Sequence, residues 1–444
     1  MEPVHFSAPV KSCFQLNTDE YFVVIGSGIA AVSAATAIRQ RNQTASITLL
    51  NEEPCLPYSR PMLTKTSFRG FSVEHYKLYD ENFYKTQNIS LRCGSPVTHI
   101  DSIQKQASLA TGETLPFDKC ICATGAECFV PPIKGNGKNG VFTIRRGTDI
   151  ESIRRRLLTA QKAVVIGGGV IGIEIAWELK KAGLDIVVLE LAQTLMERIL
   201  DAETAQFLER QLVQAGIRVY TSANIAAITG EKRADGVQLA DGTRHVGDFV
   251  ILSTGIQPNT ALAQQAGAET GRGISVNEHM QTSLPNLYAC GDCAEYRGQN
   301  AGTWGEAMQQ GTVAGANAAG EAIAFAGFPI PLSMSAANTN LFSIGDMGKA
   351  PGAAYEVRRV YNRPSAFAAL VNPRPPASES MESYYFCGGR LCGAALVGDL
   401  SRRMAVEDAV DKGQTMEEFT AREGGNEAEP VATMGPVRMA FSFL

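Results

Sequence analysis

The sequence of 444 residues has few histidines and no surplus of positive charge, and its longest uncharged run is broken by proline. The five histidines, at positions 5, 75, 99, 245 and 279, form no cluster, so we expect no metal site. The 40 Lys and Arg against 45 Asp and Glu give a net charge of −5. Because this balance provides no field that would hold phosphate backbones, we expect no nucleic-acid partner.

We also find neither a secretory signal nor a membrane-spanning segment in the sequence. Pro3, Pro9 and scattered charges interrupt the start, where a secretory signal needs an apolar core of about 7 to 15 residues. The longest uncharged run, 322–345, contains Pro329 and Pro331, and we interpret it as a crossing between domains. We therefore expect a cytoplasmic protein without a membrane span. The absence of a GxSxG nucleophile elbow disfavours hydrolase chemistry.

Two segments of the chain repeat the order strand, glycine turn, helix, strand. The first covers 21–41 and continues into an apolar strand at 46–50, and the second covers 163–190. This pattern predicts an α/β fold with two Rossmann-like dinucleotide-binding domains. We expect a discontinuous FAD-binding domain at 1–131 and 255–331, an inserted NAD-binding domain at 132–254, and a C-terminal α+β domain at 332–444. A hairpin is predicted at 383–398, turning at Gly388-Gly389.

The first glycine turn has the GxGxxA pattern at 26–31, directly after a strand and before a helix. Gly26 permits the tight turn, Gly28 lets the backbone approach a pyrophosphate, and the helix start at Ile29 and Ala30 presents unpaired N–H groups to the phosphates. Either Glu52 or Glu53, after the next strand, can accept hydrogen bonds from a ribose diol.

The second glycine turn is a complete GxGxxG, followed by an acid at the end of the next strand, Glu190. A carboxylate there can hold an adenosine 2′-OH and repels a 2′-phosphate, which favours NADH over NADPH. Two such sites in one chain predict two dinucleotides, a tightly held FAD and an exchanging NADH. The predicted contacts of the turn are Gly167, Gly169, Val170, Ile171 and Gly172.

An ordered set of motifs carries a family resemblance from residue 20 to about 345, and more weakly to 399. After the first glycine turn come LPYSRPMLTK (56–65), ATG (123–125), GGGVIG, STG (253–255) and YACGD (288–292). The set resembles the FAD/NAD(P)-binding pyridine nucleotide-disulfide oxidoreductase family, and within it the NADH:rubredoxin oxidoreductases.

The resemblance assigns roles to single residues. It implies that Asp292 contacts the flavin ribityl chain, that Arg60 and Lys65 reach the flavin, and that Glu174 lies at the nicotinamide and flavin junction, where it could pair with Lys65. Lys65 and Glu174 are accordingly the candidate catalytic residues, although two ordinary surface charges would explain them as well. Trp304 either opens a helix facing the flavin or belongs to the core. The remaining cofactor contacts that it implies are Val97, Thr124, Gly125, Gly255 and Gly291.

Cysteine positions argue against a thiol relay. The disulfide reductases of the family carry a cysteine pair near the first glycine turn or a CxxC in the nicotinamide domain, and neither occurs here. Its peroxidase and oxidase branch has a single redox cysteine where this chain reads Tyr58-Ser59-Arg60. Cys290 and Cys293 have CxxC spacing, but we place Cys290 in a strand and Cys293 at a helix start and interpret both as packed thiols.

The sequence thus predicts an FAD-dependent NADH oxidoreductase that passes electrons to a small redox protein, rubredoxin by resemblance. Two other functions stay open, an NADH oxidase that reduces O₂ directly and a non-catalytic NADH-sensing flavoprotein. Arg145-Arg146 and Arg154–Arg156 are candidates for acceptor docking, although a solvated helix face explains the second run more simply. The final domain could instead form a homodimer interface.

Overall fold

The computed structural model describes residues 20–66, 68–300, 302–327, 331–362, 379–421 and 432–434. The first nineteen residues and most of the acidic tail, to which the sequence assigns no role, lie outside these ranges. The chain divides into two compact units. The first unit comprises 1–58, 77–125 and 258–326, and the second comprises 59–76, 126–257 and 327–444. The expected boundaries of the FAD-binding, NAD-binding and C-terminal domains stay a prediction.

A parallel sheet with the order β19-β7-β1-β2-β3 forms the centre of the first unit. Residues of β1 alternate between two cores: Phe22 and Val24 face the cluster that contains α1 and α8, whereas Val23 and Ile25 face the cluster that contains β4 and β5. This burial on both sides explains the uninterrupted apolar strand. The elements are β1 (Tyr21–Ile25), α1 (Ile29–Arg41), β2 (Ser46–Leu50), α3 (Glu81–Thr86), β3 (Ile89–Arg92), β4 (Val97–Asp101), β5 (Gln106–Leu109), β6 (Thr114–Pro116), β7 (Lys119–Cys122), α7 (Ala261–Gln265), β18 (Ile274–Val276), β19 (Leu287–Ala289), the 3₁₀ turn η2 (Gly291–Cys293), β20 (Ala294–Tyr296) and α8 (Trp304–Ala318).

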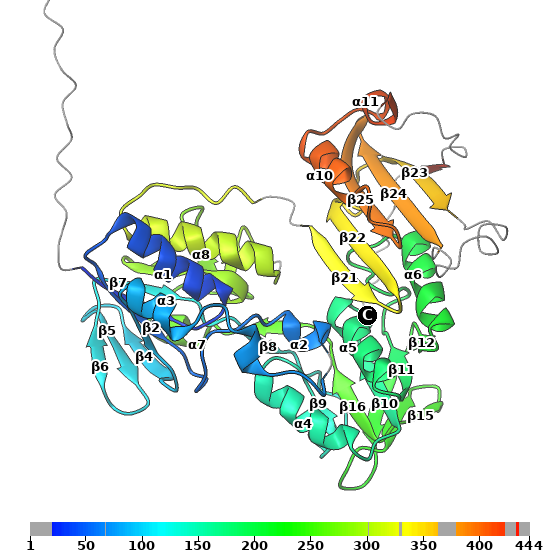
Figure 1. Cartoon of the computed structure of the whole chain (residues 1–444), viewed down its shortest axis with the longest axis horizontal. Helices are drawn as coiled ribbons and strands as arrows, with labels where there is room; N and C mark the ends of the chain where they lie inside the picture. Colours follow the sequence, from blue (N-terminus) through cyan, green and yellow to red (C-terminus); the bar gives the residue numbers. More distant parts are fainter. Residues whose placement is uncertain are drawn as a thin grey trace, which may run out of the picture. The chain divides into compact units, whose positions relative to one another are not determined.

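Helices α1 and α8 lie side by side over this sheet (Figure 1). Two glycines of α8 allow the contact, because a Cβ at Gly311 would lie 2.2 Å from the carbonyl oxygen of Ala30, and one at Gly315 would lie 2.2 Å from that of Ala34. The end of α1 is fixed by Arg39, which is 4% exposed and whose guanidinium donates to five backbone carbonyl oxygens, those of Asn42, Gln43, Ala45, Gln87 and Asn88.

The second unit contains another parallel sheet, with the order β12-β11-β10-β16-β9. Both sheets are built around a strand, glycine turn and helix, so the prediction of two Rossmann-like folds is confirmed. The elements are α2 (Met62–Lys65), the 3₁₀ turn η1 (Val73–Tyr76), β8 (Ala126–Cys128), β9 (Val141–Phe142), α4 (Gly147–Leu157), β10 (Lys162–Ile166), α5 (Val170–Lys181), β11 (Asp185–Leu189), α6 (Ala202–Gln214), β12 (Arg218–Tyr220), β13 (Ile225–Thr229), β14 (Gly236–Leu239), β15 (Arg244–Val246), β16 (Phe249–Leu252) and β17 (Ile256–Pro258).

An antiparallel sheet with the order β21-β22-β25-β24-β23-β26 completes the second unit. The predicted hairpin is confirmed as β24 and β25, with Gly388 and Gly389 at φ +58° and +76°. The interpretation of 322–345 as a crossing is wrong for its second half, because 332–345 forms the hairpin of β21 and β22. The elements are β21 (Leu332–Ala336), β22 (Thr339–Gly345), β23 (Tyr355–Asn362), β24 (Ser380–Cys387), β25 (Arg390–Val397), α10 (Arg403–Asp411), α11 (Met416–Ala421) and β26 (Ala432–Met434).

No helix in the described part of the chain has both the length and the apolar character required to cross a bilayer.

Candidate dinucleotide sites

The two glycines of the first turn have different tasks. Gly26 has φ +125°, and a Cβ there would lie 2.0 Å from the carbonyl oxygen of Ala123, so the fold itself requires glycine. Gly28 has ordinary extended angles, φ −71° and ψ 177°, and a Cβ there would meet no atom within 4 Å. Gly28 is also the N-cap of α1, and no side chain caps that helix start. This leaves uncapped N–H groups beside open space, a fit for a pyrophosphate.

The turn that carries Asp292 lies against the same helix start. Gly291 has φ +75°, and a Cβ there would lie 2.8 Å from the Cβ of Ala30. Its N–H donates to Oε1 of Gln310 at 2.9 Å. A pocket here is lined by Gly291 and Asp292, by residues that precede α8, and by residues of its first two turns as far as Gln310. The helix begins at Trp304 as predicted, but Trp304 is half-buried and does not line the pocket.

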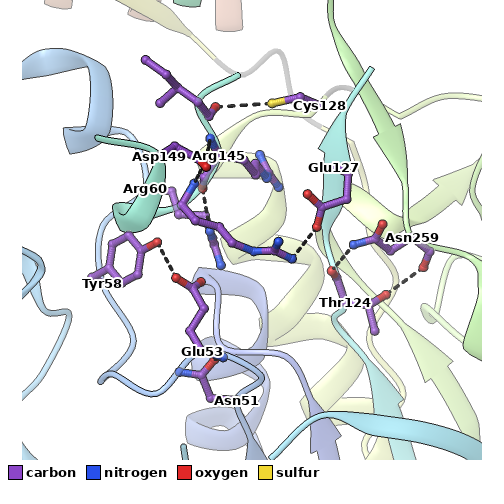
Figure 2. Close-up of polar contacts among 12 residues, drawn as sticks. Asn51, Glu53, Tyr58, Arg60, Thr124, Glu127, Cys128, Arg145, Asp149 and Asn259 are labelled. Atoms are coloured by element: carbon purple, nitrogen blue, oxygen red, sulfur yellow. Dashed lines mark hydrogen bonds and ion pairs between the residues drawn. The ribbon is translucent and has the colours of Figure 1, made fainter. Parts of the chain in front are cut away.

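The strand ends expected to brace FAD are held by a residue that the sequence analysis left without a role. Oγ1 of Thr124 donates to the carbonyl oxygen of Asn259 at 2.8 Å, and Nδ2 of Asn259 donates to that of Thr124 at 3.0 Å (Figure 2). Gly125 follows with φ +67°. Val97 begins β4, is half-buried and packs against the core of the first unit.

After β2 the structure distinguishes the two candidate ribose carboxylates. The carboxylate of Glu53 accepts a hydrogen bond from the hydroxyl of Tyr58 at 2.9 Å (Figure 2), whereas Glu52 is exposed. The residue before them, Asn51, is 2% exposed and accepts at Oδ1 from Oγ of Ser27, in the glycine turn, at 2.7 Å.

The second glycine turn repeats the first. Gly167 has φ +111° and lies against the carbonyl of Ser253, and a Cβ at Gly172 would lie 2.0 Å from the carbonyl oxygen of Gly167. At Gly169 the backbone is extended, with φ −80°, and a Cβ would again meet nothing within 4 Å. The cradle for a second pyrophosphate is therefore present. Val170 is half-buried and Ile171 is 44% exposed at the start of α5, and Gly255 has φ +107°.

Glu190 ends β11, as the strand pattern predicts, and it holds the glycine turn directly. One carboxylate oxygen accepts from the N–H of Gly168 at 2.5 Å, and the other accepts from the N–H of Ala192 at 2.8 Å. This arrangement fixes a negative charge beside the second glycine turn.

The predicted pairing of Lys65 with Glu174 is confirmed within the second unit. Nζ of Lys65 lies 3.8 Å from Oε1 of Glu174, and the hydroxyl of Thr64 donates to Oε2 at 2.6 Å. Glu174 is 2% exposed, and burial, opposed by Thr64 and Lys65, raises its pKa. Arg60 donates from its guanidinium to the carbonyl oxygen of Arg145 at 2.8 Å (Figure 2).

Three arginines of the runs 145–146 and 154–156 bind other parts of the second unit. Arg154 donates to the carbonyl oxygen of Phe68 at 3.0 Å, and Arg156 donates to that of Asp248 at 2.9 Å. The interpretation of 154–156 as a solvated face is therefore wrong for these two, and only Arg155 is exposed. Arg146 forms an ion pair with Glu127 at 2.6 Å.

The CxxC thiols are buried and free. Cys290 directly follows β19 and Cys293 is the last residue of η2, so neither thiol occupies the predicted position within a strand or at a helix start. Burial raises the pKa of Cys290 well above its ordinary value and raises that of Cys293 to about 11. Both thiols are therefore protonated and packed, a poor state for thiolate chemistry.

Residues 21–311, well over half of the chain, match the family described as pyridine nucleotide-disulphide oxidoreductase. Among curated relatives, nitrite reductase [NAD(P)H] of Bacillus subtilis is 33% identical over 329 residues, which are 74% of this chain but 41% of that protein. NADH oxidase of Methanocaldococcus jannaschii is 33% identical over 345 residues, 73% of this chain and 74% of that protein. Putidaredoxin reductase CamA of Pseudomonas putida is 33% identical over 296 residues, 65% of this chain and 70% of that protein.

Among solved structures, NADH:rubredoxin oxidoreductase from Clostridium acetobutylicum superposes with a TM-score of 0.71 and 26% identity, covering 91% of this chain and all of that one. The chain spans less than half of the nitrite reductase but most of the other two relatives. Both glycine turns and both parallel sheets lie within the matched region. The chain belongs to the pyridine nucleotide-disulphide oxidoreductase family, and it is an oxidoreductase that uses FAD and NAD(P)H.

Proposed function

We propose that the chain oxidises NADH through bound FAD and passes the electrons to a small redox protein, with rubredoxin as the first candidate. One observation carries this proposal: each unit has its own glycine turn with an open second glycine, at Gly28 and at Gly169. The first unit then holds FAD and the second holds NADH. When bound, FAD accepts a hydride and can release electrons one at a time.

The chain's own residues supply position and charge. In the first unit, the start of α1 faces the pyrophosphate, Glu52 takes the ribose, and Asp292 takes the ribityl chain. In the second unit, the start of α5 and Glu190 hold the NADH adenosine, and the fixed charge of Glu190 disfavours a 2′-phosphate. From the family resemblance, Lys65 supplies a positive charge to the flavin, and Glu174 orients Lys65 or the nicotinamide.

The choice of acceptor rests on two supports. The names of the rubredoxin and putidaredoxin reductases indicate small redox proteins as acceptors of those enzymes. In this chain, Tyr58-Ser59-Arg60 offers no thiol, and the CxxC thiols are buried. A relay through these cysteines is therefore disfavoured, and electrons would leave directly from the flavin.

The test is anaerobic reduction of the purified full chain by one equivalent of NADH, followed by oxidised rubredoxin or a [2Fe–2S] ferredoxin. Loss of flavin absorbance, and its return together with acceptor reduction, would support the proposal. Fast NADH consumption under air with no response to either acceptor would instead favour the NADH oxidase that one relative's name suggests. Flavin that stays oxidised under excess NADH would favour a sensor without turnover.

A further inference from the structure

Asn51 is the first residue after β2, and it joins the two parts of the proposed FAD site that lie in the first unit. Its Oδ1 accepts from Oγ of Ser27 at 2.7 Å and from the backbone N–H of Glu53 at 2.9 Å. Its Nδ2 donates to the carbonyl oxygen of Cys55 at 2.6 Å. Ser27 belongs to the glycine turn, and the other two partners belong to the loop after β2. One buried amide therefore holds both segments together.

The bond from Oδ1 of Asn51 to the N–H of Glu53 closes a short turn with Glu52 at its apex. Glu52 is exposed there, while the side chain of Glu53 is directed to the hydroxyl of Tyr58 (Figure 2). The turn thus holds Glu52 at an exposed position of the loop after β2.

We propose that Asn51 is a positioning residue that presents Glu52 to the adenosine ribose of FAD and keeps it in register with the pyrophosphate-binding turn through Ser27. This inference rests on the proposed FAD site. A glutamate on an untied loop would lose conformational freedom on binding, whereas a loop already fixed by a buried amide loses little. The role also suits an amide, because Asn51 both donates and accepts here, which a carboxylate cannot do.

The experiment measures FAD binding by the full-length apoprotein, using quenching of flavin fluorescence, for the unmodified chain, Asn51→Ala and Ser27→Ala. Each is titrated with FAD and with an FAD analogue that lacks the 2′-hydroxyl of the adenosine ribose. We expect Asn51→Ala, which removes three hydrogen bonds, to weaken FAD binding about tenfold, and Ser27→Ala, which removes one of them, to weaken it about threefold. Binding of the analogue should change much less, because it lacks a hydroxyl that Glu52 would hold.

A double-mutant cycle separates positioning from a general loosening of the fold. Once Glu52→Gln has removed the carboxylate, the further change Asn51→Ala should cost little, so the two effects should fall well short of adding. Ser90→Ala, at an exposed position of the neighbouring strand β3, is the matched control and should leave both titrations unchanged.

Equal weakening of FAD and analogue by Asn51→Ala, or additive effects with Glu52→Gln, would show a merely structural role and overturn the inference. Unchanged FAD binding in both Ser27→Ala and Asn51→Ala would overturn it too. Ser27→Ala guards against a folding failure of Asn51→Ala, since it removes a single hydroxyl. If the unmodified chain binds no flavin at all, the proposed function fails first, and that outcome is distinct from the others.

Discussion

The two glycine turns have the same backbone but are covered differently. At the first, Ala30 is 6% exposed and lies beneath Gly291 and Gly311, so η2 and α8 close over the start of α1. At the second, Ile171 is 44% exposed at the start of α5, and Leu191 is 70% exposed after the strand that follows. An enclosed turn suits a resident cofactor, and an open turn with apolar side chains at its rim suits a ligand that must leave. This difference supports the proposed division into FAD and NADH sites.

The link between turn and following strand differs as well. In the first unit the neutral amide of Asn51 holds Ser27, whereas in the second the carboxylate of Glu190 holds Gly168. An amide adds no charge beside a pyrophosphate. A carboxylate next to the second turn adds one, which matters for the choice between NADH and NADPH.

The largest effect should come from Arg39→Met, in the last turn of α1, where the first unit also differs from the second. Arg39 is buried and donates to five carbonyls, while the residue at the same place in α5, Lys180, is half-buried. Removing the guanidinium leaves several carbonyls unsatisfied, so we expect a loss of about 3 to 5 kcal/mol in the free energy of unfolding. Denaturant unfolding measures it, with Lys180→Met as the matched control expected to cost under about 1 kcal/mol. Similar losses in both variants would contradict the role of Arg39.

Gly28→Ala and Gly169→Ala test the two cradles directly. Both positions have backbone angles that any residue adopts and space for a Cβ, so the fold should tolerate the change. The methyl group would occupy the place of a pyrophosphate, and we expect FAD affinity to fall about 100-fold in Gly28→Ala. Gly169→Ala should keep its flavin and raise KM for NADH at least about tenfold.

Far-UV circular dichroism and thermal unfolding of the flavin-free proteins provide the control, and both variants should match the unmodified chain. A yellow Gly28→Ala protein with normal FAD affinity would remove the basis for placing FAD at the first turn.

The glycine turns also show which parts of the fold and of the candidate sites can be predicted from the sequence. The strand, glycine turn and helix pattern predicted both parallel sheets, both helix starts and Glu190, because the determinants are local in the chain. Asn51, Arg39 and Asn259 were missed, because each has a hydrogen-bond partner on a distant segment, and no spacing rule links the two. Gly311 and Gly315 did leave a signal, since two glycines four apart inside a helix indicate a close packing partner. Residues 332–345 were misread because an uncharged stretch with prolines at its start also fits a buried hairpin.

Glu190→Gln sharpens the difference in charge between the two turns. The substitution keeps the size and a hydrogen-bonding group but removes the negative charge that disfavours a 2′-phosphate. We expect the ratio of kcat/KM for NADH over NADPH to fall about tenfold, mainly through improved use of NADPH. Glu197→Gln, an acid further along the same loop, is the control and should leave the ratio unchanged. An unchanged ratio in Glu190→Gln would show that another feature selects the nucleotide.

Glu174→Gln should raise the stability of the fold and slow the reduction of flavin by NADH. Burial raises the pKa of Glu174 above its ordinary value of 4.5, so the folded state favours the protonated carboxyl and loses stability as the pH rises through the raised pKa. Removing the charge should therefore raise Tm at pH values well above 4.5 and change it little below. If Glu174 also orients Lys65 or the nicotinamide, stopped-flow reduction of the flavin by NADH should slow a few-fold.

Glu127→Gln is the matched control, because that carboxylate is 44% exposed in an ion pair of the same unit. It should show neither the gain in Tm nor the slower reduction. A Glu174→Gln protein with a lower Tm at neutral pH would mean that the contacts from Lys65 and Thr64 outweigh the cost of burial.

The smallest effect is expected at the CxxC thiols, which test whether electrons leave the first unit through sulfur. Cys290 and Cys293 are both fully buried, and burial raises the pKa of Cys293 to about 11, so neither provides a ready thiolate at neutral pH. Cys290→Ala/Cys293→Ala should therefore leave flavin reduction and acceptor reduction within about twofold of the unmodified rates, with a modest loss of stability from the two small cavities. Cys93→Ala, at an exposed thiol of the same unit, separates accidental surface modification from any effect of the buried pair. A double variant that still accepts a hydride but fails to reduce the acceptor would place the thiols on the path, and the direct exit from flavin would have to be abandoned.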